Sequence, residues 1–291
     1  MAEYKIFTDS TTDLSAEMVA DLELEMIPLE FTIAGKSYLN YPDGHEMSNK
    51  EFYSLLRAQN TSTTSQVNTS RFLEIFEPVL QEGFDIVYIA FSSGLSGTFN
   101  CSKLAAEELN QKYPSRKVYV VDSLAASMGE GLLVYHAVMQ KRAGMTAEEL
   151  AKWLEATRLH LCHWFTVDDL NHLKRGGRVS PAAALFGTML GIKPVLHVDD
   201  EGHLIPIEKV RGRKASLDAL VAHMEKTAIK PQDQTVFISH GDCLADAEYV
   251  AKAVQQKFKV KNVVINYIGP VIGAHSGPGT VALFFLGKQR L

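Results

Sequence analysis

Short apolar runs that end in polar residues alternate with helix-like segments through the first half of the chain. Each following segment has apolar positions spaced three or four residues apart. Strands of this length that alternate with helices are typical of a parallel sheet covered by helices on both faces. The first half is therefore predicted to be an α/β domain. Its expected strands are residues 4–10, 85–90 and 117–121, and its expected helices are 11–24, 68–83, 101–113 and 130–144.

Capping signals mark the start of several expected helices. Ser15 is suited to cap the first helix, and the pairs Ser48–Glu51 and Thr146–Glu149 have the spacing of capping boxes. Residues 68–83 have the regular spacing of an amphipathic helix. Its apolar stripe consists of Phe72, Ile75, Phe76, Val79 and Leu80.

The second half of the chain has a mixed pattern. Residues 159–167 alternate as a strand does, and residues 191–212 have the pattern of a hairpin that turns at residues 200–202. A helix follows, and then a strand, a helix and a further strand. This mixture predicts a smaller α+β domain that begins near Leu161. The expected division is an α/β domain at 1–160 and an α+β domain at 161–291.

Composition and charge narrow the class of protein. The 291 residues are 46% hydrophobic and 22% charged, as in a soluble globular protein, and a net charge of −5 gives no reason to expect nucleic acid as a partner. Three well-separated cysteines without a CxxC pair favour a reducing compartment. The start of the chain lacks a signal-peptide pattern, and no apolar run approaches the roughly 20 residues of a membrane span. We expect a cytoplasmic protein with at most transient membrane contact, in an oligomeric state that the sequence leaves open.

Segments rich in serine, threonine and glycine follow several predicted strands. Ligands of open α/β sheets bind beyond the carboxyl ends of the strands. Glycines let backbone N–H groups approach a ligand, helix N-termini favour anions, and hydroxyls donate hydrogen bonds without adding charge. These segments therefore suit a carboxylate or a phosphate, although the same residues are ordinary helix caps. They are the loops at 7–13, 91–98 and 121–127, with 60–70 as a fourth loop before a helix.

The loop at 91–98 matches no complete catalytic motif. It has neither a nucleotide-binding glycine signature nor a following lysine, which disfavours a small-molecule kinase. Gly94–Thr98 lacks the final glycine of a GxSxG nucleophile elbow. A serine hydrolase or esterase that uses Ser96 and His275 stays open as an alternative, since its catalysis depends on a spatial arrangement that the sequence does not give.

A metal site is not expected. His160, Cys162 and His163 are close in sequence, but alternate side chains of a strand point to opposite faces, so the three do not form a compact ligand set. The chain also lacks a matching downstream pair of ligands.

Two further glycine-containing loops contain side chains that are able to bind an anion or a partner. In residues 269–285, four glycines and two prolines surround His275, whose ring can donate an N–H to an anion or pair with it when charged. Residues 173–180 form a short basic loop, for which a solvated turn is the simplest interpretation. A docking patch for an acidic or phosphate-bearing partner is the more specific interpretation of this loop. The basic side chains of this loop are Lys174, Arg175 and Arg178.

Taken together, these segments resemble the DegV family of bacterial fatty-acid-binding proteins. The matching segments occur in the family's order and span nearly the whole chain. One departure is that Val67 and Asn68 stand where the family often has Pro-Ser, so the resemblance does not define the geometry of that loop. The matching segments are DST at 9–11, TSQ at 64–66, SSGLSGT at 92–98, VDS at 121–123, LKRGGRVS at 173–180 and GAHSGPGT at 273–280.

The resemblance implies a binding protein and not an enzyme, with one long-chain fatty acid held between an α/β and an α+β domain. It implies that Thr64, Ser96 and His275 hold the carboxylate, with help from Ser65 and the Gly97 N–H. The implied partner is a separate ATP-dependent fatty-acid kinase subunit that phosphorylates the bound acid. The acyl phosphate then passes to phospholipid synthesis. No metal, nucleotide or other cofactor is implied for this chain.

Other residues receive roles from the same resemblance. Arg175 and Arg178 become candidates for meeting the kinase or supporting the site. The residues Leu185, Phe186, Met189 and Leu190 are able to line an acyl tunnel, although ordinary core packing explains them as well. The preferred acyl length and unsaturation depend on the shape of the tunnel, which the sequence does not define.

Overall fold

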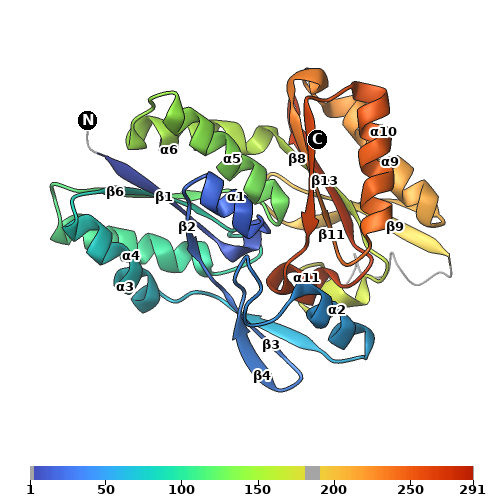
Figure 1. Cartoon of the computed structure of the whole chain (residues 1–291), viewed down its shortest axis with the longest axis horizontal. Coiled ribbons are helices and arrows are strands. Elements are labelled where there is room, and N and C mark those ends of the chain that lie inside the picture. Colours follow the sequence, from blue (N-terminus) through green and yellow to red (C-terminus); the bar gives the residue numbers. More distant parts are fainter. Residues whose placement is uncertain (1–2, 181–190, 291) are drawn as a thin grey trace.

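The strands of this computed structural model fall into three sheets within the residues that the structure describes, which are 3–180 and 191–290 (Figure 1). The first sheet is parallel, with the strand order β2-β1-β6-β7. It confirms the α/β fold expected for the first half. Its strands are β1 (Tyr4–Asp9), β2 (Glu25–Ile27), β6 (Asp85–Ala90) and β7 (Val118–Asp122).

Helices cover both faces of the parallel sheet (Figure 1). On one face, α3 and α4 pack on alternate side chains of β6, including Ile86 and Tyr88. On the other face, α5 and α6 pack on Val87 and Ile89. The predicted capping box of α6 is complete, since Thr146 and Glu149 bond each other's backbone N–H. The helices are α1 (Ala16–Asp21), α3 (Thr69–Gln81), α4 (Thr98–Lys112), α5 (Met128–Arg142) and α6 (Ala147–Thr157).

A small antiparallel sheet stands beside the parallel one, with the strand order β4-β3-β5. The loop expected at 60–70 is therefore wrong in part, because Ser62–Ser65 forms β5. Register with β3 places Thr64 opposite Phe31. A run of polar residues has no apolar periodicity, so the pairing with β3 and not the local sequence makes this segment a strand. The other elements here are β3 (Glu30–Ile33), β4 (Lys36–Leu39) and α2 (Asn49–Arg57).

The second half forms a mixed sheet with the strand order β10-β9-β8-β13-β11-β12. The predicted hairpin is confirmed, because β9 and β10 pair antiparallel and the Gly202 N–H bonds the Asp199 carbonyl in the turn. Helices α9 and α10 cover one face of this sheet (Figure 1). The elements are β8 (Leu161–Thr166), β9 (Ile192–Val198), β10 (Leu204–Arg211), α9 (Arg213–Thr227), β11 (Thr235–His240), α10 (Leu244–Phe258), β12 (Asn262–Tyr267) and β13 (Val281–Leu286).

Two short helices occupy segments that the sequence presented as loops. The segment Pro270–Ser276 is helix α11, so the expectation that His275 lies in a loop is wrong: it lies in the last turn of a helix. Proline at the first helical position and Gly277 with φ +78° after the last one explain how so short a helix begins and ends. In the basic segment, Asn171–Arg175 is helix α7. Short 3₁₀ turns are η1 (Ser10–Thr12), η2 (Arg158–His160) and η4 (Pro231–Asp233).

The two large sheets share a hydrophobic core. Helix α5 contacts both β6 of the parallel sheet and the strands β8, β11 and β13 of the mixed sheet. One buried cluster joins Ile89 and Leu132 with Phe237 and Phe284. The mixed sheet begins at Leu161, and the division of the chain into two domains there stays a prediction. No helix among the described residues is both long and apolar enough to cross a membrane.

Candidate functional site

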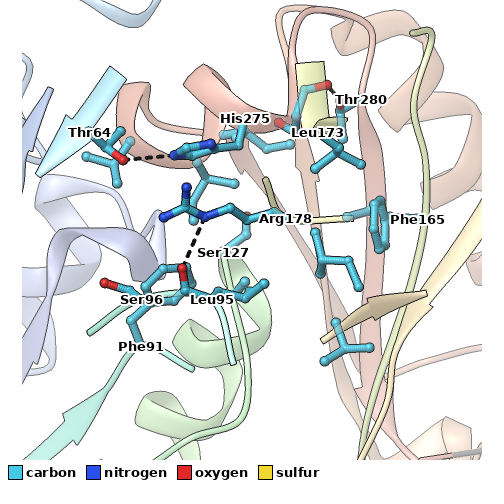
Figure 2. A pocket seen from close by; sticks show the side chains of 18 of the residues that line it. Thr64, Phe91, Leu95, Ser96, Ser127, Phe165, Leu173, Arg178, His275 and Thr280 are labelled. Carbon is cyan, nitrogen blue, oxygen red and sulfur yellow. Dashed lines mark hydrogen bonds between the residues drawn. The ribbon is translucent and has the colours of Figure 1, made fainter. Parts of the chain in front are cut away.

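A cavity of about 310 Å³, here called the main cavity, lies where the small sheet, the loop after β6, α11 and the mixed sheet meet (Figure 2). Its volume falls within the range of small-molecule sites. Most of its wall is apolar, and hydroxyl and imidazole groups line it where β5, α11 and the start of α4 approach one another. The apolar wall includes Phe91, Leu95, Phe165, Val271, Ala282 and Phe284.

Thr64 and His275 are hydrogen-bonded at the wall of the main cavity. The Thr64 Oγ1 lies 2.8 Å from the His275 Nε2 (Figure 2). Burial, and then the nearby charge of Arg178, lower the pKa of His275 to about 4, so the ring is neutral at pH 7. The His275 Nδ1 has no partner among the described residues and lies against Gly176, where a Cβ would be 2.1 Å from it. Only glycine at position 176 therefore leaves room for this ring.

Ser96 lines the same cavity just before helix α4. Its hydroxyl lies 3.0 Å from the Thr98 Oγ1 and accepts a 3.3 Å bond from the Thr98 N–H. Gly97, which precedes the first residue of α4, also lines the cavity, and a Cβ there would lie 2.1 Å from the Gln66 Oε1. The backbone thus approaches Gln66 closely, as a glycine-containing loop allows.

Buried carboxylates hold the loops that carry these groups. Asp9 accepts bonds from the Thr11 N–H and hydroxyl, from the Tyr88 hydroxyl at 2.7 Å and from the Phe91 N–H at 3.2 Å. Asp122 accepts a 3.1 Å bond from the Ser93 N–H. The polar ends of the three parallel strands are therefore joined to one another and position the loop that contains Ser96.

Arg178 reaches the main cavity from the segment after α7. Its Nε donates a 3.1 Å bond to the Leu95 carbonyl (Figure 2). Its Nη1 donates to the Gly176 carbonyl. Burial lowers the pKa of Arg178 from its ordinary value, but the guanidinium stays charged at neutral pH. The structure gives Arg178 no ion pair with a carboxylate among residues 3–180 and 191–290. Within the described part of the chain, a positive charge without an acidic partner thus borders the site.

Comparison with known proteins decides the family. A family model of DegV proteins matches residues 3–288, which is nearly the whole chain. The chain belongs to the DegV family. The resemblance found from the sequence is thereby confirmed, and the α/β fold with a second sheet agrees with the structures of other DegV proteins.

Related DegV proteins cover the full length of the chain. A DegV domain-containing protein of Clostridium perfringens is 47% identical over 290 residues, which span 100% of this chain and 99% of that protein. A DegV lipid-binding protein of Thermotoga maritima is 29% identical with a TM-score of 0.86, over 99% and 100% of the two chains. DegV of Bacillus subtilis, a fatty-acid-binding protein, is 28% identical with a TM-score of 0.85, over the same shares.

The DegV fold brings most of the predicted site residues to one cavity, but not all in the same role. Thr64, Ser96, Gly97, His275 and Arg178 line the main cavity. Ser65 also borders it, yet its hydroxyl donates a 3.2 Å bond to Glu30, as expected for a neighbour of Thr64 on the other face of β5.

Arg175 lies in a different cavity. A second cavity of about 320 Å³, here called the outer cavity, is lined by Arg175, His172 and the polar residues of β5. It shares Thr64, Arg178 and His275 with the main cavity. Arg175 donates a 3.0 Å bond to the His172 Nδ1. The hydrogen-bonded pair of Thr64 and His275 therefore lines both the mostly apolar main cavity and the more polar outer cavity.

Two other chemistries find little support in this arrangement. Ser96 and His275 are not hydrogen-bonded to each other, and the His275 Nε2 bonds Thr64 instead, so the pair lacks the geometry of a hydrolase nucleophile and base. Among residues 3–180 and 191–290, no group of three metal-ligating side chains is found. The four apolar candidates for a tunnel at 185–190 lie outside the described residues.

One cavity residue was missed by the functional analysis of the sequence. His163 was considered only as a metal ligand, but it lines the main cavity beside Phe284. The alternation of β8 is a signal that could have found it, because it places His163 and Phe165 on the same face.

Proposed function

We propose that this protein binds one long-chain fatty acid, with the acyl chain in the main cavity and the carboxylate at Thr64, Ser96 and His275. The observation that carries the proposal is the hydrogen-bonded pair of Thr64 and His275 at the side of a mostly apolar cavity. The binding of lipid or fatty acid by the Thermotoga maritima and Bacillus subtilis relatives supports the same ligand class.

A fatty acid requires both the apolar wall of the main cavity, for its acyl chain, and the polar groups of that wall, for its carboxylate. Each buried methylene contributes about 0.8 kcal/mol, so a long chain supplies roughly 10 kcal/mol of gross transfer free energy. A carboxylate buried without hydrogen bonds would cancel several kcal/mol of it. In this proposal the hydroxyls of Thr64 and Ser96 donate to the carboxylate, and the Gly97 N–H and the Ser65 backbone complete the shell. The charge of Arg178 favours the ionised acid.

The proposal extends to a partner. We infer that a separate ATP-dependent fatty-acid kinase subunit phosphorylates the bound acid, since this chain has no phosphate loop of its own. Hydroxyls and a neutral imidazole hold a carboxylate oxygen less tightly than a bidentate arginine would, which leaves it free to accept a phosphoryl group. The outer cavity, with Arg175 at its wall, gives the kinase a basic approach to that oxygen.

Lipid extraction tests the ligand. The protein purified from bacteria and extracted under denaturing conditions should release intact fatty acid in a near-equimolar amount, identified by mass spectrometry. Ser96→Ala and His275→Ala should lower this amount and the rate of phosphorylation by a cognate kinase. Ser65→Ala, whose hydroxyl bonds Glu30, serves as the matched control and should retain the acid. Unchanged retention and phosphorylation in both site variants would contradict the proposed carboxylate site.

A further inference from the structure

Two buried carboxyl groups, those of Asp9 and Glu130, contact the same hydroxyl. The Thr11 Oγ1 lies 2.5 Å from the Asp9 Oδ1 and 2.7 Å from the Glu130 Oε2, and all three residues are fully buried. A threonine hydroxyl has one hydrogen and donates it to one acceptor. Two ionised carboxylates therefore cannot both bond this hydroxyl, so one of the two carboxyl groups is protonated and donates to the Thr11 oxygen.

The donors around Asp9 identify it as the ionised member of the pair. Its Oδ1 also accepts a 3.0 Å bond from the Thr11 N–H, and its Oδ2 accepts bonds from the Tyr88 hydroxyl at 2.7 Å and the Phe91 N–H at 3.2 Å. Burial raises the pKa of Asp9 above its ordinary value, but these hydrogen bonds favour the charged form and oppose that rise. Both oxygens of Asp9 thus act as acceptors.

Glu130, in the first turn of α5, has few donors of its own. Apart from Thr11, the described residues offer it the Thr8 hydroxyl at 3.3 Å, and that hydroxyl also donates to the Ile89 carbonyl at 3.0 Å. Burial, and then the charge of Asp9, raise the pKa of Glu130 well above its ordinary value. Glu130 is therefore the protonated group: it donates to the Thr11 hydroxyl, which in turn donates to Asp9.

The charged groups that face Glu130 oppose its ionisation. Asp9 of β1 and Asp13 at the end of η1 both raise its pKa. Tyr88 of β6 is neutral because burial raises the pKa of its hydroxyl well above the ordinary value. His163 of β8, which packs against the first turn of α5, is neutral because burial holds its pKa well below the ordinary value. The uncharged side chains at the start of α5 include those of Thr8, Ser239 and Phe284.

This chain of hydrogen bonds ends at the loop that carries Ser96. Phe91, whose N–H donates to Asp9, lines the main cavity, and Ser96 lies further along the same loop. We propose that Glu130 is a positioning residue of the fatty-acid site, whose proton allows the ionised Asp9 to hold this loop. The inference rests on the proposed function, in which Ser96 bonds the carboxylate of the acid. An ionised Glu130 would repel Asp9 and compete for the Thr11 hydroxyl, and the loop would lose its anchor.

Isosteric amides distinguish the two carboxyl groups. Glu130→Gln replaces one neutral donor by another, because its amide N–H is able to donate to the Thr11 oxygen. Asp9→Asn instead puts an NH₂ group where Asp9 accepts hydrogen bonds. In titrations with a fluorescent fatty acid at neutral pH, we expect Glu130→Gln to stay within about twofold of the wild-type affinity and Asp9→Asn to bind about tenfold more weakly. Equal effects of the two substitutions, or the reverse order, would overturn the assignment of the proton.

Infrared spectroscopy detects the proton itself. A protonated carboxyl group has a C=O stretching band that a carboxylate lacks, and isotope labelling of glutamate alone separates Glu130 from the buried aspartates. At neutral pH the labelled wild-type protein should show this band, and Glu130→Gln should lose it. Glu17→Gln is the matched control and should keep the band, because Glu17 also lies in the first turn of a helix but is exposed. If Asp9→Asn does not fold, the band still decides: its absence from the wild-type protein would overturn the proposal.

These outcomes separate the inference from the proposed function. The infrared band reports the proton on Glu130 without any ligand, so its absence would overturn the role of Glu130 while leaving fatty-acid binding intact. A wild-type protein that shows the band but binds no fatty acid would overturn the proposed function, and with it the role of Glu130 in positioning the site.

Discussion

The Thr64 hydroxyl and the His275 imidazole, 211 positions apart in sequence, meet in a hydrogen bond of 2.8 Å. The bond joins a strand of the small sheet to a seven-residue helix of the second half. The two residues also line both the mostly apolar main cavity and the more polar outer cavity. The proposed carboxylate site therefore depends on how the two halves of the chain pack, and this dependence leads to specific expectations.

Removal of the Thr64 hydroxyl should weaken fatty-acid binding. Thr64→Val keeps the shape of the side chain but removes one hydrogen bond to the carboxylate and leaves the His275 Nε2 without its partner. One such bond contributes about 0.5–1.5 kcal/mol, which corresponds to a loss of affinity of roughly twofold to tenfold. Thr63→Val, on the exposed face of the same strand, is the control for titration with a fluorescent fatty acid. Equal affinities of the two variants would contradict the role of Thr64.

Gly176 should be required for the position of His275. A Cβ in Gly176→Ala would lie 2.1 Å from the His275 Nδ1, so the ring must move away from Thr64 and binding should fall. Gly177→Ala is the contrasting variant: φ +70° there disfavours alanine by about 1–2 kcal/mol, but a Cβ meets no atom within 4 Å. We expect lower stability with normal binding for Gly177→Ala. Normal binding by Gly176→Ala would show that His275 need not be held in this position.

Asp13 should make the stability of the protein fall as the pH rises. Burial raises the pKa of Asp13 from 3.8 to about 8, although it accepts bonds from Ser127 and the Gly269 N–H. A raised carboxyl pKa means that the folded state favours the protonated form of Asp13. The contribution of Asp13 to the free energy of unfolding is therefore complete below pH 3.8 and is lost as the pH rises through about 8.

The variant Asp13→Asn tests whether the Asp13 carboxyl causes this fall in stability with pH. Asparagine keeps an acceptor for the Gly269 N–H and tolerates the left-handed φ of 53° at this position. Thermal unfolding should give a higher Tm for Asp13→Asn than for the wild type at about pH 9 and a similar Tm at about pH 5. A Tm difference that does not change with pH would contradict the raised pKa.

Arg290 should stabilise the junction between the two halves. Its side chain is 1% exposed and its guanidinium donates only to backbone carbonyls among the described residues. Arg290→Met keeps the apolar stem but leaves these carbonyls unpaired, and we expect a loss of roughly 2–4 kcal/mol in the free energy of unfolding, measured with urea. The accepting carbonyls are those of Leu124, Arg158, Leu161 and Asp199.

The exposed Lys288 provides the comparison for Arg290. Lys288→Met changes the charge in the same way near the same end of β13, but its side chain is exposed. Its free energy of unfolding should stay within about 0.5 kcal/mol of the wild type. Equal effects of the two substitutions would contradict a structural role for the buried guanidinium.

Periodicity and capping predicted much of the fold from the sequence. The parallel strands, the amphipathic helix α3 and the capping box of α6 depend on neighbours within a few positions, so local patterns describe them well. Strand β5 and helix α11 were taken for loops. One is a polar run that becomes a strand by pairing with β3, and the other is a seven-residue helix with an internal glycine.

The sequence indicated some residues of the candidate site and missed the place of others, because those places depend on contacts between distant parts of the chain. Hydroxyls, glycines and a histidine in strand-end loops indicated an anion, and the structure brings Thr64, Ser96 and His275 to one cavity. The place of Arg175 in the outer cavity and of His163 in the apolar wall depends on the packing of the two halves. Residue spacing alone carries no information about that packing.

A fatty acid labelled with an NMR-active isotope at its carboxyl carbon tests the central claim most directly. The bound acid should give one carboxyl signal in the wild-type protein, and this signal should shift in Thr64→Val, Ser96→Ala and His275→Gln but not in Ser65→Ala. An identical carboxyl signal in all of these variants would place the acid end elsewhere and contradict the account.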